Sequence, residues 1–377
     1  MATPSATLNP PMQEMKILNK PSDMQAAIES EFKIVGDEEY QKDDDIFTRH
    51  PNKYYEFASK DCSLTFLNKL FRWMHTTELE MREAAGIKFA IIAAIAMGIV
   101  GAMKVEFFYE VSCMNYLFLQ MLVSLGIFYL CCRQLDVLPF LEDEGLQFKL
   151  KVSAVASLLG VLLYVASWNY WPRQYSHFLI CAIPLVENLR EGLTSNFKTK
   201  DFVLLAVNYI GFFILLTITD NKKSFTILGL GLALGGVALF WYSFQELKAL
   251  GSSNVLSIGM IITLVFSIFM PGFFGIAVAK PPSIIELLVI ICLGSISSVA
   301  FLMMFRSIQI TKPSHCLMAF TVALAIIWYV RTVNTDGFLF QGVIGVLLSV
   351  GCAVYILYEQ QDKTTIMTYM TREPLIK

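Results

Sequence analysis

The sequence predicts an all-α integral membrane protein with ten transmembrane helices, arranged as two inverted repeats of five helices each. The composition is the first observation: 55% of the 377 residues are hydrophobic and only 16% are charged. Soluble domains are about 45–50% apolar and about 25% charged. The second observation is that the apolar residues fall in long blocks after residue 83. The third is an internal match between the two halves of the chain.

Charge and cysteine content exclude other classes. The net charge of −2 comes without a long basic run, so we expect no nucleic-acid partner. The eight cysteines contain no C-x-x-C pair, and we expect neither a disulfide framework, nor a metal site, nor a cofactor. The first 30 residues lack an apolar core, so insertion by the first span, without a cleaved signal, is expected.

Ten apolar runs are candidates for membrane helices, because a helix needs roughly 20 apolar residues to cross the hydrocarbon core. The runs are 89–103, 111–132, 152–172, 174–186, 202–219, 224–245, 249–279, 287–305, 313–330 and 337–358. The fourth run is short and contains His177 and Pro184. We keep it as a span because of the distribution of charge between the linkers.

The linkers alternate in basic character. With ten spans, Lys and Arg are more frequent in the two tails and in the linkers after even-numbered spans than in the other linkers. The positive-inside rule then predicts that both termini of this multi-pass protein are cytoplasmic. Plasma membrane and endomembrane both remain open.

An offset of 138 residues relates the first repeat, within residues 84–219, to the second repeat, within residues 223–358, to within one residue at the ends. It superposes these pairs: Ser176 and Ser314, His177 and His315, Thr194 and Thr332, Phe202 and Phe340, Gly98 and Gly236. Because each half has an odd number of spans, the second half would enter the membrane from the opposite side. Inverted repeats of this kind are the construction of many secondary transporters, which bind solute near the membrane midplane.

The two repeat openings carry a family resemblance. Residues 86–98 form a Gly/Ala-rich first helix, residues 228–242 open the second repeat similarly, and Pro184 lies in the fourth span. In these features the chain resembles the EamA-like ten-helix members of the drug/metabolite transporter superfamily. It departs from them at Gln120, where a basic residue is common, and at Val322, where the proline would repeat. The resemblance implies a transporter fold over roughly residues 84–358.

Polar groups within spans are costly and usually face the bundle interior. The candidates for substrate binding are Asn115, Gln120, Asn169, Trp241, Tyr242 and Ser298. For Asn and Gln, the alternative is a hydrogen bond that holds two helices together. Pro271 and Gly272 should kink the seventh span, and they are candidates for gating.

His177 and His315 are candidates for proton coupling, because histidine titrates near neutral pH. The alternative is that both are ordinary helix-end histidines. Trp168 and Trp328 stand near predicted span ends, where an interfacial aromatic belt is favoured over a substrate cage. Glu187, with Arg190, is expected at the cytoplasmic end of the fourth span as a local ion pair.

The tails differ in length. Residues 1–83 form a polar N-terminal tail that we expect to be mostly disordered, with an amphipathic helix at 64–75 lying on the membrane surface. Residues 359–377 form a short polar C-terminal tail.

The function expected from the sequence is secondary transport of a small metabolite by alternating access between the two repeats. The partners are then a small-molecule substrate and the lipid bilayer, and a homodimer is compatible with this class. An enzyme is not expected, because the spans hold no His/Asp/Glu cluster with ligand spacing. Two alternatives stay open: an endomembrane nucleotide-sugar-type antiporter, and a non-transporting scaffold subunit with a carrier-like fold.

Overall fold

The computed structural model describes most of the chain from residue 65 onward. The described residues are 65–81, 83–107, 113–135, 137–141, 143–170, 173–194, 199–217, 226–251, 253–274, 283–311, 313–336 and 340–372. All of them belong to one compact unit, which begins at Tyr55. Within these ranges the regular secondary structure is α-helical, and there is no strand.

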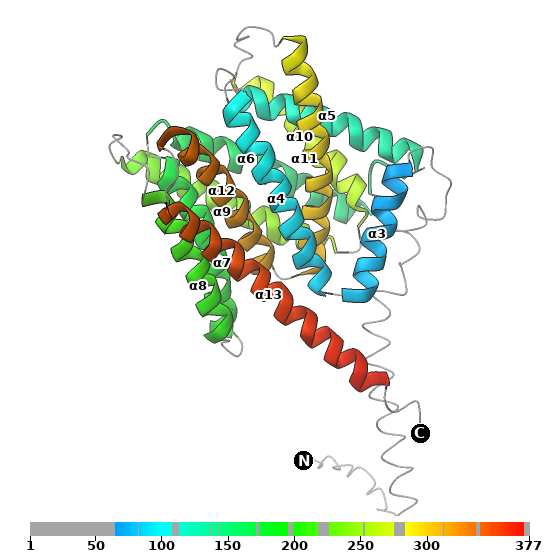
Figure 1. The fold of residues 1–377 in the computed structure, drawn as a ribbon. Coiled ribbons are helices and arrows are strands. Elements are labelled where there is room, and N and C mark those ends of the chain that lie inside the picture. The colour runs from blue at the N-terminus through cyan, green and yellow to red at the C-terminus, as the bar shows by residue number, and fades with distance from the viewer. Residues whose placement is uncertain are drawn as a thin grey trace, which may run out of the picture. The chain divides into compact units, whose positions relative to one another are not determined.

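The described helices follow one another with short connections (Figure 1). They are α3 (Thr65–Met81), α4 (Glu83–Phe107), α5 (Cys113–Gln134), α6 (Glu144–Ser167), α7 (Arg173–Thr194), α8 (Thr199–Thr217), α9 (Ile227–Ala249), α10 (Val255–Phe274), α11 (Ile284–Ile310), α12 (Pro313–Asp336) and α13 (Phe340–Arg372). Each of the ten apolar runs of the sequence therefore overlaps a described helix, from α4 to α13.

Six of the described helices are long and apolar enough to cross a membrane: α4, α5, α6, α9, α11 and α13. Shorter apolar segments lie in α8, α10 and α12. α7 falls in neither group, and it carries Glu187 and Arg190 after its apolar run. These helices make the chain a multi-pass α-helical membrane protein.

Side-chain caps define where several helices begin. Asp143 precedes α6 and accepts hydrogen bonds from the first backbone N–H groups of the helix. At the start of α11, Ser283 and Glu286 form a reciprocal capping box. Such caps satisfy backbone donors that have no partner within the helix. The loop-to-helix boundaries are thus fixed by local sequence.

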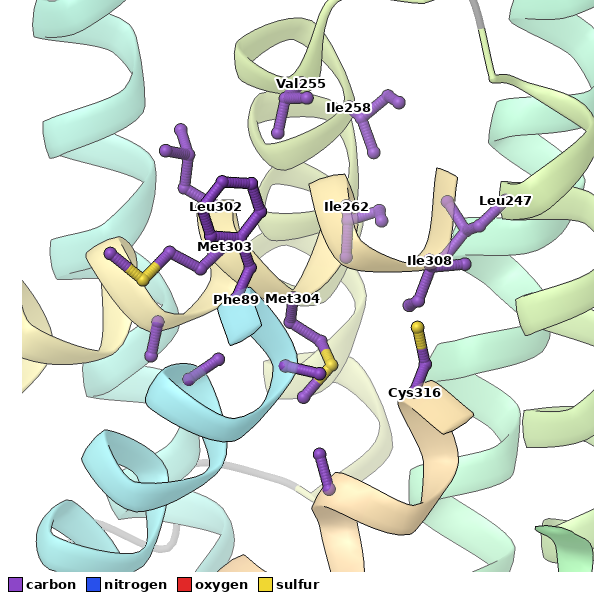
Figure 2. Packing of buried hydrophobic residues seen from close by; sticks show 14 of the residues in the cluster. Phe89, Leu247, Val255, Ile258, Ile262, Leu302, Met303, Met304, Ile308 and Cys316 are labelled. Carbon is purple, nitrogen blue, oxygen red and sulfur yellow. The ribbon is translucent and has the colours of Figure 1, made fainter. Parts of the chain in front are cut away.

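The main core draws apolar side chains from both halves of the chain (Figure 2). Phe89 of α4 packs in the same cluster as Ile258 of α10, Met303 of α11 and Cys316 of α12. In lipid, apolar side chains gain little by leaving their surroundings, so such a core is stabilised by close van der Waals packing. The two halves therefore form one packed body.

Glycines allow two helix pairs to approach closely. A Cβ atom at Gly160 of α6 would lie 3.2 Å from the carbonyl oxygen of Gly236 of α9, and a Cβ at Gly236 would lie 2.9 Å from that of Gly160. Gly211 of α8 and Gly345 of α13 stand in the same mutual relation, at 3.0 and 2.8 Å. Small residues at such contacts are typical of membrane helix packing.

Three expected boundaries differ from the structure. α7 extends to Thr194, so Glu187 lies inside the helix and not at its end. α13 extends to Arg372, through much of the segment expected to be a tail. α3 begins at Thr65 and ends at Met81, and its Phe71 and Met74 are buried in the main core, so this helix packs on the bundle. Residues 1–64 of the expected disordered tail lie outside the described residues.

Candidate functional site

The first candidate site contains a buried carboxylate and lies between α7 and α9. We call it the Glu187 cluster, formed by Glu187, Arg190, Trp241 and Gln245. The Glu187 carboxylate accepts hydrogen bonds from the Trp241 indole N–H at 2.5 Å and from the Gln245 amide at 3.1 Å. Arg190, one turn further along α7, forms an ion pair with it at 3.1 Å and lies 5.2 Å from the centre of the Trp241 ring. This ion pair is the local pair that the sequence predicted.

The two charges of the Glu187 cluster have different surroundings. The Glu187 side chain is 2% exposed, whereas that of Arg190 is 54% exposed. A carboxylate is buried at an acceptable cost only when charge and hydrogen bonds compensate it, and here three donors do so. Trp241 and Gln245 both lie within the candidate span of α9. The cluster is thus a charged contact between the two halves of the chain at the level of a membrane helix.

Gln120 and Ser298, two of the predicted substrate-binding residues, both lie in the contact between α5 and α11. The Gln120 amide donates to the Ser297 hydroxyl at 2.5 Å, and the Ser298 hydroxyl donates to that of Ser124 at 3.0 Å. All four side chains are buried. Each group therefore has a partner in the neighbouring helix, which is the helix-holding alternative that the sequence left open.

His177 lies among aromatic rings. Its ring centre is 5.6 Å from those of Tyr164 and Trp168 and 5.7 Å from that of Trp328 on α12, and its Nδ1 forms a hydrogen bond with the Tyr164 hydroxyl. Trp328 is buried in the fold. An interfacial belt, favoured by the sequence for these tryptophans, therefore does not describe Trp328, because tertiary packing places it against His177.

His315 is buried in the first turn of α12, in the part of the helix opposite to Trp328. The 13 residues between the two correspond to about 20 Å along the helix axis, at 1.5 Å per residue. Since Trp328 contacts His177, His177 lies against the second half of α12, whereas His315 lies in its first turn. They are separate centres, and a direct proton transfer between them is excluded by this distance.

The remaining predicted residues are dispersed. Asn169 is exposed in the turn after α6, and Tyr242 of α9 is 42% exposed, so the structure brings neither to the interior contacts described above. Pro271 and Gly272 lie in α10, which continues through them to Phe274, and Asn115 lies in the first turn of α5. The side chains of these three residues lie outside the described part of the structure.

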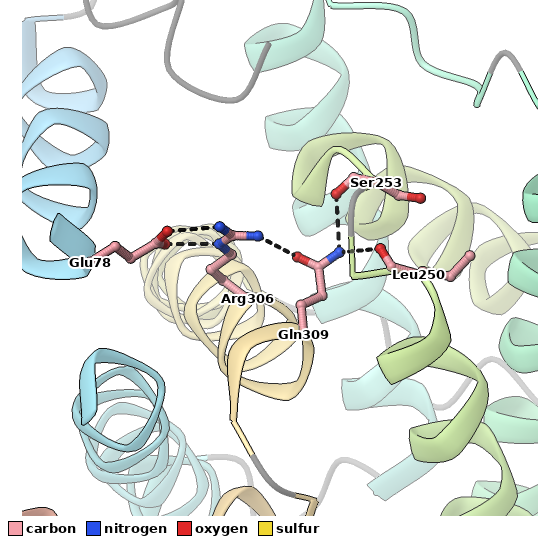
Figure 3. Close-up of polar contacts among 5 residues, drawn as sticks. All are labelled: Glu78, Leu250, Ser253, Arg306 and Gln309. Atoms are coloured by element: carbon pink, nitrogen blue, oxygen red, sulfur yellow. Dashed lines mark hydrogen bonds and ion pairs between the residues drawn. The ribbon is translucent and has the colours of Figure 1, made fainter. Parts of the chain in front are cut away.

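A second charged contact, missed by the sequence reasoning, joins α3 to α11 (Figure 3). The Arg306 guanidinium donates to both carboxylate oxygens of Glu78, at 2.8 and 2.7 Å, and also to the side-chain oxygen of Gln309 at 3.2 Å. The Gln309 amide then donates to the carbonyl oxygens of Leu250 and Ser253, at 2.9 and 3.0 Å. We call these five residues the Arg306 network.

The signal for the Arg306 network was weak in the sequence. Arg306 directly follows an apolar run, where a charge is expected at the membrane surface, and Glu78 lies in the segment assigned to the tail. Only the folded chain brings the two together. Among the residues that the structure describes, no three His, Cys, Asp or Glu side chains are grouped so that they could hold a metal ion.

Comparisons with known proteins agree with the architecture. No protein-family model matches the chain, and no curated protein matches it. A solved structure described as "Crystal structure of protein" superposes with a TM-score of 0.55 at 12% sequence identity, covering 70% of this chain and 94% of that chain. At this identity the likeness concerns the fold alone, and it shows that nearly the whole of a solved chain shares this helical arrangement.

Proposed function

We propose that the protein is a secondary transporter that moves a small metabolite across a membrane by alternating access between α4–α8 and α9–α13. The observation that carries this proposal is the packing symmetry of the helices. It supports two inverted repeats of five spans each, the organisation that transporters use to expose one site to either side in turn. The proposal includes an EamA-like fold, and it is the resemblance of the sequence to that family that supports this part.

The symmetry follows from which helices touch. Exchanging each helix for its counterpart five helices along the chain converts the α6–α9 contact into the α11–α4 contact. The same exchange converts α5–α11 into α10–α6, and α7–α8 into α12–α13. It leaves the pairs α5–α10, α7–α12 and α8–α13 as they are. All of these contacts are present in the bundle.

Contacts between helix ends support the alternating direction of the helices. Thr226, at the start of α9, donates to the Tyr170 carbonyl in the turn between α6 and α7, at 2.7 Å. At the other end, Ser257 near the start of α10 donates to the Leu138 carbonyl in the α5–α6 linker, at 2.7 Å. The Arg306 network joins α3 to the α9–α10 turn at that same end. Since basic residues are more frequent there, we assign it and both termini to the cytoplasm.

The two arginine–carboxylate pairs described above favour a neutral or zwitterionic solute over an anionic one. A nucleotide sugar requires cationic side chains that are available for phosphate. Arg190 and Arg306 are instead paired with carboxylates, those of Glu187 and Glu78. The Glu187 cluster offers a carboxylate, a guanidinium and an indole face within one contact, and its partners can be exchanged for the polar groups of a small solute.

Proton coupling through His177 and His315 is the second part of the proposal. His177 forms a hydrogen bond through its Nδ1 with the Tyr164 hydroxyl, a group with which an imidazole can exchange a proton. The pH dependence of uptake should therefore differ between wild type and the His177→Gln and His315→Gln variants. An unchanged profile in both variants contradicts this coupling.

Counterflow with purified protein tests transport itself. Liposomes preloaded with unlabelled metabolites should accumulate the labelled form of a transported solute. Glu187→Gln should slow this exchange more than Glu246→Gln, a change of the same type on α9 outside the cluster. Absence of counterflow across a panel of amino acids, amines, sugars, nucleotides and nucleotide sugars would favour the scaffold alternative, and exchange of nucleotide sugars alone would favour the antiporter.

A further inference from the structure

α3 lies against the bundle through one stripe of side chains. Phe71, Met74, Thr77, Glu78 and Met81 are buried, and they recur at the three- and four-residue spacing of one helix face. Lys69, Arg72 and Glu80, on the remaining surface, are exposed. The helix is therefore a separate amphipathic element, which precedes the first span and is seated on the bundle by its own contacts.

The front of this stripe covers a pocket. Leu70 and Phe71 line it together with residues from three bundle helices: Ile127, Phe128 and Cys131 of α5, Leu256 of α10, and Ser298, Val299 and Leu302 of α11. Ser298 also belongs to the polar contact between α5 and α11, through its hydrogen bond to Ser124. α3 thus covers a small apolar groove between α5, α10 and α11, next to the Ser298–Ser124 hydrogen bond.

The rear of the stripe is held by the Arg306 network (Figure 3). The side chains of Glu78 and Arg306 are only 8% and 9% exposed, and both guanidinium–carboxylate hydrogen bonds are short. Bidentate pairs of this type are directional and among the stronger polar contacts. Through Gln309, the same network also fixes the α9–α10 turn. The Arg306 network therefore connects α3 to the turn between α9 and α10.

We propose that α3 is a reversible latch, in which the Glu78–Arg306 pair holds α3 over the groove between α5, α10 and α11 and its release opens that groove. An ion pair suits such a device, because both charges regain hydration when they separate, which lowers the cost of release relative to a purely apolar contact. Arg306 keeps Gln309 as an acceptor in the released state. The opening itself is independent of transport; the consequence that the latch limits solute exchange rests on the proposed function.

The seating of α3 is tested by the reactivity of Cys131, which is buried in the groove. Maleimide labelling of the purified full chain would be followed over time, and the modified peptide identified by mass spectrometry. Glu78→Gln should accelerate labelling of Cys131 by more than about tenfold. Breaking a buried ion pair costs more free energy than a tenfold increase in the population of released α3 requires. Glu80→Gln removes the same charge from the exposed face of the same helix and should leave the rate within about twofold of wild type.

A charge reversal separates release of α3 from misfolding. The double variant Glu78→Arg with Arg306→Glu rebuilds the pair in the opposite sense and should return the labelling rate to that of wild type. Labelling of Glu78→Gln at the wild-type rate overturns the latch. Equally fast labelling in Glu80→Gln or in the charge-reversed variant also overturns it, because the effect would then be general loosening.

Reversible locking tests the consequence for exchange. Leu70→Cys places a thiol on α3 in the pocket that Cys131 lines, and oxidation should join the two and stop counterflow until a reductant is added. The matched control is Leu70→Cys combined with Cys131→Ala, which should be insensitive to oxidant. Full counterflow in the cross-linked protein overturns the latch as a limit on exchange. If wild type itself moves no solute, the transport proposal fails, while the labelling result still decides whether α3 is released.

Discussion

Replacing Gly236 by alanine tests the close contact between α6 and α9. The new Cβ would lie 2.9 Å from the Gly160 carbonyl oxygen and 2.9 Å from the Tyr164 backbone nitrogen. Both are backbone atoms of a helix, so neither can move aside alone, and the two helices must separate by several tenths of an ångström. Overpacking of this type costs about 1–3 kcal/mol.

A matched control exists on the same helix. Among the residues that the structure describes, none outside its own turn of α9 would approach a Cβ at Gly231 within 4 Å. Gly231→Ala therefore keeps the helix-propensity gain of alanine, about 1 kcal/mol, without a clash. Because both variants share that gain, the difference between them isolates the contact. Gly236→Ala should be less stable than Gly231→Ala by about 1–3 kcal/mol.

Thermal unfolding in detergent measures this difference. Melting temperatures of wild type and of both variants would be followed by the loss of the monodisperse peak on size-exclusion chromatography. Gly236→Ala should melt below Gly231→Ala, and Gly231→Ala at or above wild type. Equal melting temperatures for the two variants would refute the α6–α9 contact, and with it one of the helix pairings on which the packing symmetry depends.

Three further predictions concern the polar contacts. Arg306→Met should lower the unfolding free energy by up to about 3–5 kcal/mol, the cost of leaving Glu78 buried without its partner, and release of α3 limits this loss; adding Glu78→Leu should recover most of it in the same melting assay. Gln120→Leu should cost under about 1 kcal/mol, the range of interhelical hydrogen bonds in membranes, and a changed KM for a solute would instead show that Gln120 touches substrate. Glu187→Ala should lower stability by about 1–3 kcal/mol, since three donors lose their acceptor; a neutral result contradicts the geometry of the cluster.

The sequence predicted the helices well where one long apolar block was enough. α4 and α11 are such cases, because a helix is the only open-chain conformation that satisfies its own backbone in lipid. α7 was the difficult case. Its apolar run stops at Val186, but the helix continues to Thr194. The helix can continue because Glu187 has a hydrogen-bond partner on α9, and because backbone hydrogen bonds do not require apolar side chains.

Only some of the predicted site residues lie in contacts between helices. Gln120, Trp241 and Ser298 were chosen as polar groups within apolar runs, and each does lie in a contact between helices. Asn169 was chosen by the same rule but lies exposed in a turn, since a position near the end of a run does not tell which way the chain leaves the helix. Selecting polar residues within apolar runs identifies polar groups in membrane helices, but it does not identify the residues that they contact.

The amino-acid sequence by itself determined the class of this protein: its apolar blocks require helices in a bilayer, and the number and order of those blocks follow from counting. The tertiary structure alone decided which partners the buried charges find on distant segments of the chain. Glu187 pairs with α9, and Glu78 reaches Arg306 across 228 positions of the chain. The physical reason is that hydrophobic burial is a property of each segment, readable locally, whereas an ion pair depends on two segments whose separation only the packed helices set.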